Sequence, residues 1–174
     1  MELPGMTYRG AALDDVEVLE RLPVDYAQLL AQRNGFVALG GALHVRGACR
    51  EPAWHSVRAA WEGPAALFRL FSALRPDDVP FAQESTGDQF VLRGGAVHRL
   101  RAAENRVEEL GFDLSGFLDA ALRDPLEVLG LDLLSDYRRE GTPLRPGQLL
   151  TREHPPRALP AEEVLAALAG LKPA

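Results

Sequence analysis

The sequence has very little cysteine and no long apolar run. Its one cysteine, Cys49, excludes a disulfide within the chain, which is consistent with a reducing compartment. No apolar stretch approaches the roughly 20 residues that a helix needs to span a bilayer. The first ten residues, MELPGMTYRG, lack the basic segment and apolar run of a secretory signal. We therefore expect a cytoplasmic protein that does not enter a membrane.

Motifs of a catalytic or metal centre are also missing. The histidines form neither an HExxH nor an HxH pattern, and no CxxC occurs. Ser85 and Ser115 lack the GxSxG context of a nucleophile elbow. The pairs Gly40-Gly41 and Gly94-Gly95 match neither a P-loop nor a dinucleotide fingerprint. We therefore expect a non-enzymatic chain that needs no metal or cofactor.

Several conspicuous residues have ordinary structural interpretations. His98 is expected on the surface of a strand, because a metal site needs several convergent ligands. His55 follows Trp54, which favours a small aromatic contact. Cys49 is expected to be a buried, inert thiol, and Trp54 and Trp61 are expected to pack in the core or against helices.

The formal net charge of -6 comes without a basic patch, so direct nucleic-acid binding is disfavoured. Moderate negative charge can simply keep a protein in solution, or it can attract a basic protein partner. Acidic residues flank the central part of the chain, and they form either a solvated face or a docking surface. The candidate partner-binding residues are Asp78, Glu84, Asp88, Glu104 and Glu108. Asp88 has a second interpretation, since Asp beside Gly commonly closes a turn.

If Glu84 and Asp88 lie on such a docking surface, reversing both to Lys should weaken partner binding more than it affects folding. The oligomeric state, monomer or homodimer, stays open.

The composition indicates one domain with a substantial core. A chain of 174 residues with 47% hydrophobic and 25% charged residues is ordinary for a globular protein. We expect a single domain over 1–174, divided into N-terminal helices at about 13–35, a sheet core at about 78–110, and C-terminal helices with a Pro-rich segment at about 113–174.

The stretch 78–110 predicts an antiparallel meander. Residues 90–93 and 96–100 are β-rich and flank Gly94-Gly95, a pair suited to a type I′ turn, which needs positive φ at both central positions. A second reversal at 103–105 leads into 106–110. Pro80 cannot donate to a ladder, so the strand around Phe81 is expected to be short or to lie at an edge. Residues 42–46 alternate like a half-buried strand.

Helices are expected before and after this sheet. Pro23 opens a helix that stops at Asn34-Gly35, and Pro64 opens another that ends near Leu74. After the meander, helices are expected at about 113–122, 125–129, 131–139 and from Pro160 onward, with a short strand at 148–150. The fold class is therefore α+β: a central antiparallel β-sheet with helices packed before and after it.

Three segments in this order resemble the SUKH superfamily, which includes the Smi–Knr-type cell-wall regulators. Residues 22–30, LPVDYAQLL, lead to Asn34-Gly35 and are similar to the family's "LPxDYxxFL…NG" opening. Pro80-Phe81 and Gly87-Asp88 resemble the central "PFA…fGDxFLL" segment, and residues 97–100 its "VYRL" strand. Pro146-Gly147, followed by Pro155-Pro156, looks like the "LxPGxxL…PP" tail of bacterial members. Thr86 departs from the pattern, which often has a bulky residue there.

The resemblance implies an α+β fold without catalytic activity. Bacterial members are mostly inferred to be immunity proteins that bind and neutralise a toxin, often a nuclease. It therefore implies that this chain binds a cognate protein toxin, which the charge predicts to be basic. A regulatory or scaffold role of the Smi–Knr type is the alternative, followed by a small-ligand binder or an uncharacterised enzyme.

Overall fold

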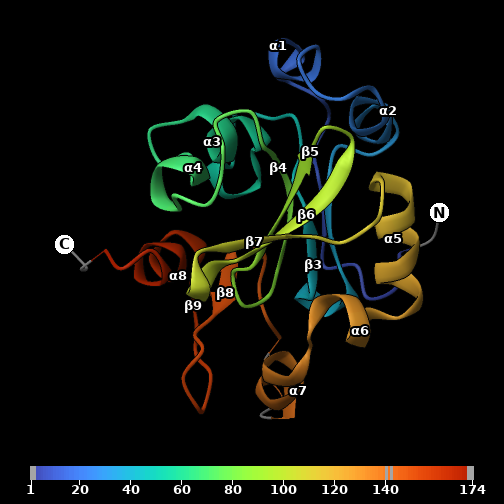
Figure 1. Cartoon of the computed structure of the whole chain (residues 1–174). Helices are drawn as coiled ribbons and strands as arrows, with labels where there is room; N and C mark the ends of the chain where they lie inside the picture. Colours follow the sequence, from blue (N-terminus) through green and yellow to red (C-terminus); the bar gives the residue numbers. More distant parts are fainter. Residues whose placement is uncertain (1–2, 140, 142, 172–174) are drawn as a thin grey trace.

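The strands of the main sheet follow one another in space in the order of the sequence (Figure 1). The computed structural model describes residues 3–139, 141 and 143–171. Each neighbouring pair of strands is antiparallel. The seven strands are β1 (Tyr8–Arg9), β2 (Phe36–Ala38), β3 (Leu43–Val45), β4 (Val79–Glu84), β5 (Gln89–Arg93), β6 (Ala96–Arg101) and β7 (Arg106–Glu109). The predicted meander is confirmed as β4–β7, and β1–β3 extend it into a larger sheet.

The turn at Gly94-Gly95 joins β5 to β6 as predicted. Both glycines have positive φ, 59° and 84°, and Arg93 pairs with Ala96 across the turn. The second reversal is a 3-10 turn, η3 (Ala102–Glu104), followed by Asn105 with φ of 46°. Asn tolerates this left-handed conformation better than most residues.

Pro80 lies in the middle of the sheet, which corrects the prediction of a short or edge strand. β4 has six residues, all buried, and lies between β3 and β5. The register between β4 and β5 shifts between Pro80 and Ala82. A bulge of this kind lets a proline, which has no N–H to donate, sit inside a sheet.

Helices and short turns cover the sheet (Figure 1). They are α1 (Val16–Leu19), α2 (Val24–Gln32), the 3-10 turns η1 (Leu39–Gly41) and η2 (Ala53–His55), α3 (Val57–Glu62), α4 (Leu67–Leu70), α5 (Leu114–Arg123), α6 (Pro125–Leu129), α7 (Asp132–Arg139) and α8 (Ala161–Leu168), and a small hairpin pairs β8 (Gln148–Leu150) with β9 (Ala158–Pro160). The helix expected from Pro64 to Leu74 is reduced to the single turn α4. In the described ranges, no helix combines the length and apolar character that crossing a bilayer requires. Of the C-terminal range expected at about 113–174, residues 140, 142 and 172–174 lie outside the described residues.

Two cores lie on opposite faces of the sheet, because successive side chains of a strand point to opposite sides. Phe90 of β5 packs with Phe117 of α5 in one core, and their ring centroids are 4.5 Å apart. Val91, the next residue, belongs to the other core with Phe71, which follows α4, and Val164 of α8. β3 is buried on both faces, not half-buried as its alternation suggested. The polar members of β3–β5 on the second face build the site described next.

Candidate binding site

Polar side chains from three neighbouring strands meet in the interior of the sheet. The strand register pairs His44 of β3 with Gln83 of β4, and Gln83 with Gln89 of β5. Arg46 follows β3, two residues beyond His44, and reaches the same strip. All four residues are buried. We call His44, Arg46, Gln83 and Gln89 the polar strip.

Arg46 is the charged member of this strip. Its Nη2 donates to Oε1 of Gln83 at 2.8 Å and to Oε1 of Gln89 at 2.7 Å, and its Nη1 donates to the carbonyl oxygens of Pro80 and Ala82 at 3.1 and 3.4 Å. Only 3% of Arg46 is exposed, and burial lowers its pKa to about 10. The guanidinium therefore stays charged at neutral pH. Its acceptors are all neutral, and no carboxylate of the described residues forms a salt bridge with it.

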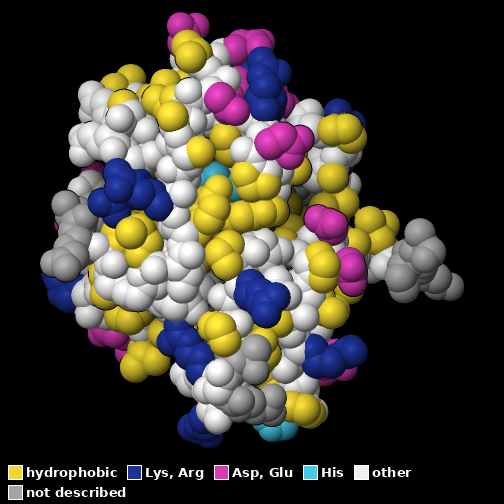
Figure 2. Space-filling model, turned by 180° about the vertical axis from the view of Figure 1, so that it is seen from behind, with side chains coloured by type: hydrophobic (Ala, Val, Ile, Leu, Met, Phe, Trp, Pro, Cys, Tyr) yellow, Lys and Arg dark blue, Asp and Glu magenta, His cyan; other side chains and the backbone are white. Residues whose placement is uncertain are grey.

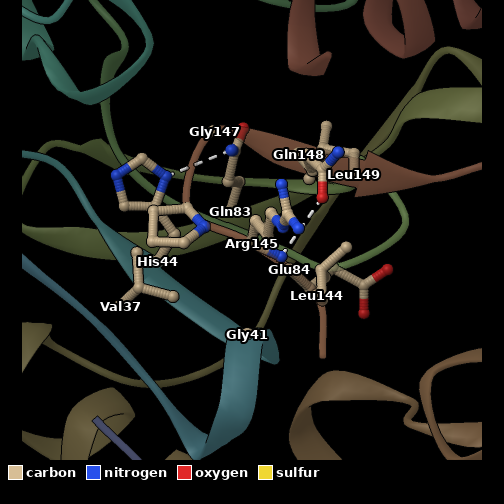
Figure 3. Close-up of a pocket in the computed structure, with 11 residues that line it drawn as sticks. Val37, Gly41, His44, Gln83, Glu84, Leu144, Arg145, Gly147, Gln148 and Leu149 are labelled. Atoms are coloured by element: carbon tan, nitrogen blue, oxygen red, sulfur yellow. Dashed lines mark hydrogen bonds between the residues drawn. The ribbon is translucent and has the colours of Figure 1, made fainter. Parts of the chain in front are cut away.

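A chain of hydrogen bonds continues from Gln83 through both buried histidines. Because Oε1 of Gln83 accepts from Arg46, its Nε2 donates to Nδ1 of His44 at 3.1 Å (Figure 3). Nε2 of His44 lies 2.9 Å from Nδ1 of His55, and Nε2 of His55 lies 3.0 Å from the carbonyl oxygen of Asn34. This direction places a proton on Nε2 of each ring. Burial lowers the pKa of both histidines, His44 the more strongly, so both rings are neutral.

Asn34 and Gly35 hold the end of this chain. The Asn34 side chain accepts from the Ala48 amide at 2.7 Å and donates to the Ala48 carbonyl oxygen at 3.2 Å. Gly35 has φ of 76°, and a Cβ there would lie 2.6 Å from Cε1 of His55. The pair predicted as a helix stop does follow α2, and it also fixes the position of the His55 ring.

A small cavity beside His44 has room for about one water molecule. Its volume is about 10 Å³. Segment 144–149, which includes Pro146 and Gly147, covers it (Figure 3). Gly147 has φ of 81°, and a Cβ there would lie 3.1 Å from the Trp54 ring. Pro146-Gly147 therefore closes this part of the molecule against Trp54.

A larger cavity of about 390 Å³ lies at the other end of the polar strip. Arg46 and Gln83 line it, and most of its remaining walls are alanine and leucine side chains from α3, α4 and α8. Trp54 of η2 completes the wall. We call this space the Arg46 cavity.

The acidic residues predicted to form a docking surface are mostly internal, and the prediction is corrected for three of them. Asp78 is 3% exposed and forms a two-pronged ion pair with Arg93, with both N–O distances at 2.7 Å. Asp88 is 1% exposed, and its carboxylate lies 2.9 Å from Nη2 of Arg99 and 2.6 Å from Nη2 of Arg152. Such buried carboxylates are paired because an unpaired buried charge is costly.

Glu84 is the third buried acid, at 2% exposure. It lies 3.2 Å from Nη2 of Arg99 and accepts a hydrogen bond from Thr86. Burial raises the pKa of Glu84 to about 7, against the opposing effect of Arg99.

Asp88 also accepts from the backbone N–H of Ala102 at 2.9 Å. It therefore has a structural role, as its second interpretation held, but it joins the β6–η3 corner instead of closing the Gly87 turn.

The two remaining candidates lie nearer the surface but are already paired. Glu104 is exposed and lies 2.9 Å from Arg106. Glu108 is partly buried and lies 2.8 Å from Arg101. The face predicted from these acids therefore offers little free negative charge.

A groove between α2 and α5 carries acidic side chains that form no ion pair with the described residues, although Oδ1 of Asp25 accepts from the Tyr26 amide at 3.0 Å. Its volume is about 250 Å³. Leu29, Leu114 and Leu118 lie at its base, and Asp25 and Asp119 lie on its two rims, exposed. The other lining residues are Gln28, Gln32 and Ser115. No ion pair joins Asp25 or Asp119 to another described residue, and no basic residue lines the groove. Sequence reasoning missed this site, because its two walls are about 90 residues apart in the chain.

The single-residue expectations are mostly confirmed. His55 contacts Trp54, with ring centroids 5.4 Å apart. Cys49 is buried, and burial raises the pKa of its thiol to about 12. His98 lies partly buried on β6.

Among the described residues, no group of three His, Cys, Asp or Glu side chains could hold a metal ion.

Comparison with models of known protein families, with characterised proteins and with solved structures finds no match to this chain. The likeness to the SUKH superfamily stays a prediction from the sequence, and the geometry of the groove and of the polar strip carries the functional argument.

Proposed function

We propose that this chain is a non-catalytic protein-binding module that acts as an immunity protein: it binds and neutralises a basic protein toxin, such as a nuclease, in the cytoplasm. The observation that carries the proposal is the α2–α5 groove, with an apolar base and unpaired carboxylates on both rims. The resemblance of the sequence to SUKH proteins supports the same conclusion.

The groove has the chemistry of a protein interface. Apolar side chains at its base would lose water when a partner binds, while the polar rim fixes orientation. Asp25 and Asp119 would pair with Lys or Arg of the partner. Opposite charges of this kind also speed encounter and select against acidic partners.

The wider surface favours the same partner. Acidic side chains gather at the top of the molecule in Figure 2, which is the end where Figure 1 places α1 and α2. Glu20 is exposed there, next to α1, and Glu17 of α1 is exposed but pairs with Arg58 at 3.1 Å. Val24, the first residue of α2, and Phe112, two residues before α5, are exposed hydrophobic residues. They would add apolar contact area beside the rims.

The test is co-expression with the toxin encoded beside the gene for this chain. We expect the wild-type chain to rescue growth, and the purified chain to bind a catalytically inactivated form of the toxin. The double variant Asp25→Lys and Asp119→Lys should weaken binding by about tenfold or more at low salt, since charge pairs at interfaces have effects of this order.

The matched control reverses two acids outside the groove, Glu127→Lys on α6 and Glu163→Lys on α8. Both side chains are exposed, so these changes alter net charge equally while leaving the groove intact. Thermal melting confirms that each variant is folded. The proposal fails if the neighbouring toxin neither binds nor is neutralised. If both double variants lose the same binding affinity, the α2–α5 groove is not the surface that binds the toxin. Binding to a basic protein that is not toxic would favour the regulatory alternative.

A further inference from the structure

The Arg46 cavity contains a buried positive charge without a negative partner. Nine-tenths and more of the Arg46 side chain is removed from solvent, and the guanidinium contacts only amide and carbonyl oxygens of the described residues. Neutral acceptors occupy both Nη atoms but do not neutralise the charge, and Nε of Arg46 has no hydrogen-bond partner among the described residues. Arg99, the other buried arginine of the described residues, differs because it lies between the carboxylates of Glu84 and Asp88.

The cavity that Arg46 lines is large and mostly apolar. Its volume of about 390 Å³ falls within the roughly 300–1,000 Å³ of small-molecule sites. Leu67 and Leu70 of α4 face Leu165 of α8 across it, and Trp54 adds an aromatic wall. Polar groups from the polar strip, Arg46 and Gln83, are confined to one end of the lining.

The lining also contains one acidic residue, Glu162. It lies in the first turn of α8, is exposed, and forms no salt bridge in the described chain. Because Glu162 stays in solvent, it does not serve as the counter-ion of Arg46. A carboxylate that neutralises Arg46 would therefore have to come from another molecule.

We propose that the Arg46 cavity binds a small amphiphilic carboxylic acid, with its carboxylate on Arg46 and its apolar body between α4 and α8. A carboxylate suits this position because it can accept a charge-assisted hydrogen bond from Nε–H, the donor of Arg46 that the described residues leave open. The apolar walls would remove a short acyl chain or an aromatic ring from water, which favours binding. This binding is independent of the partner groove between α2 and α5.

The probes are octanoate, octan-1-ol and octylammonium, which share one chain length and differ in head-group charge. Trp54 lines the cavity and Trp61 does not, so Trp61→Phe leaves a reporter of binding. In this background, octanoate should change the fluorescence saturably, with a Kd at least tenfold lower than that of octan-1-ol. Octylammonium should bind most weakly, because its charge matches that of Arg46.

Two variants on α8 separate filling of the cavity from a general effect of a larger side chain. Ala166 lines the cavity, whereas its neighbour Ala167 is exposed and does not. Ala166→Phe should raise the Kd for octanoate tenfold or more, and Ala167→Phe should leave it unchanged. Equal affinity of the two variants would overturn the proposed location.

A third variant addresses the charge. Arg46→Gln should bind octanoate and octan-1-ol with similar affinity, because the cavity keeps its apolar walls and loses its cation. Arg46→Gln also removes the hydrogen bonds from Arg46 to Gln83 and Gln89, which can disturb the polar strip. Comparing octanoate with octan-1-ol on the wild-type protein tests the role of the charge without a substitution. If octan-1-ol binds the wild-type cavity as tightly as octanoate, the assignment of a carboxylate to Arg46 is wrong.

Discussion

Nε2 of His44 lies 2.9 Å from Nδ1 of His55, inside a run of hydrogen bonds that starts at the Gln83 amide and ends at the Asn34 carbonyl oxygen. Each ring both accepts and donates within this run. A second proton on either ring would leave two donors facing each other. The arrangement therefore favours two neutral histidines.

The first prediction concerns the titration of this pair. Their folded-state pKa values lie below the ordinary value of 6.5, so the unfolded chain binds protons more readily than the native one. The resulting stability is present above pH 6.5 and is lost as the pH falls below it. NMR of ¹⁵N-labelled imidazoles should show the Nε2–H tautomer for both rings at pH 7. A ring that titrates near 6.5 in the native state would contradict the hydrogen-bond run.

The second prediction concerns Glu84 and has the opposite sign. Its folded-state pKa is about 7, above the ordinary value of 4.5. Its favourable contribution is therefore complete below about pH 4.5 and is lost as the pH rises through 7, a change of about 3 kcal/mol. Glu84→Gln keeps the shape and removes the titration. The stability of this variant relative to the wild type should therefore rise between pH 4.5 and pH 8, as measured by urea denaturation. A constant difference would show that Glu84 does not titrate in that range.

The third prediction replaces the expectation that Glu84 and Asp88 serve mainly in binding. Asp88 is buried between Arg99 and Arg152, so Asp88→Ala should leave those two cations without their shared partner. Breaking a buried ion pair in this way costs about 3–5 kcal/mol. Glu104→Ala, which removes an exposed acid, should change the free energy of unfolding by less than about 1 kcal/mol. Denaturant titration of both variants decides between a structural role and a surface role for Asp88.

The fourth prediction concerns Gly35. Its φ of 76° disfavours any side chain, and a Cβ would lie 2.6 Å from His55 and 2.7 Å from the Val45 carbonyl oxygen. Gly35→Ala should therefore lower the free energy of unfolding by about 2 kcal/mol or more. Gly94→Ala is a suitable control, because Gly94 has a positive φ but open space around it. The control should lose less stability, and equal losses would mean that the contact with His55 has little effect.

The sequence predicted the elements that depend on neighbouring residues. Gly94-Gly95 predicted the β5–β6 hairpin, and the helices expected at about 113–122 and 125–129 correspond to α5 and α6. These features depend on turn and capping preferences of residues that are close together in the chain, so the sequence alone is sufficient to predict them.

The candidate sites depend on contacts between distant segments, and the sequence did not reveal them. The sequence around Pro80 predicts a short or edge strand, because the bulge that accommodates this proline involves β5 as well as β4. The sequence predicts Glu84 and Asp88 to be surface acids, because their partners, Arg99 and Arg152, lie farther along the chain. No residue near Arg46 in the sequence predicts its burial, because that burial depends on strands that come more than 30 residues later.

The strand order has a consequence for how this fold can diversify. β3 and β4 are neighbours in the sheet, yet residues 46–78 separate them in the chain. That excursion supplies Arg46, Trp54 and the α3 and α4 sides of the cavity. Substitutions within the excursion's α3 and α4 walls would reshape the cavity while every strand kept its partner and register. Related chains with this topology can therefore acquire different ligand preferences on an unchanged sheet.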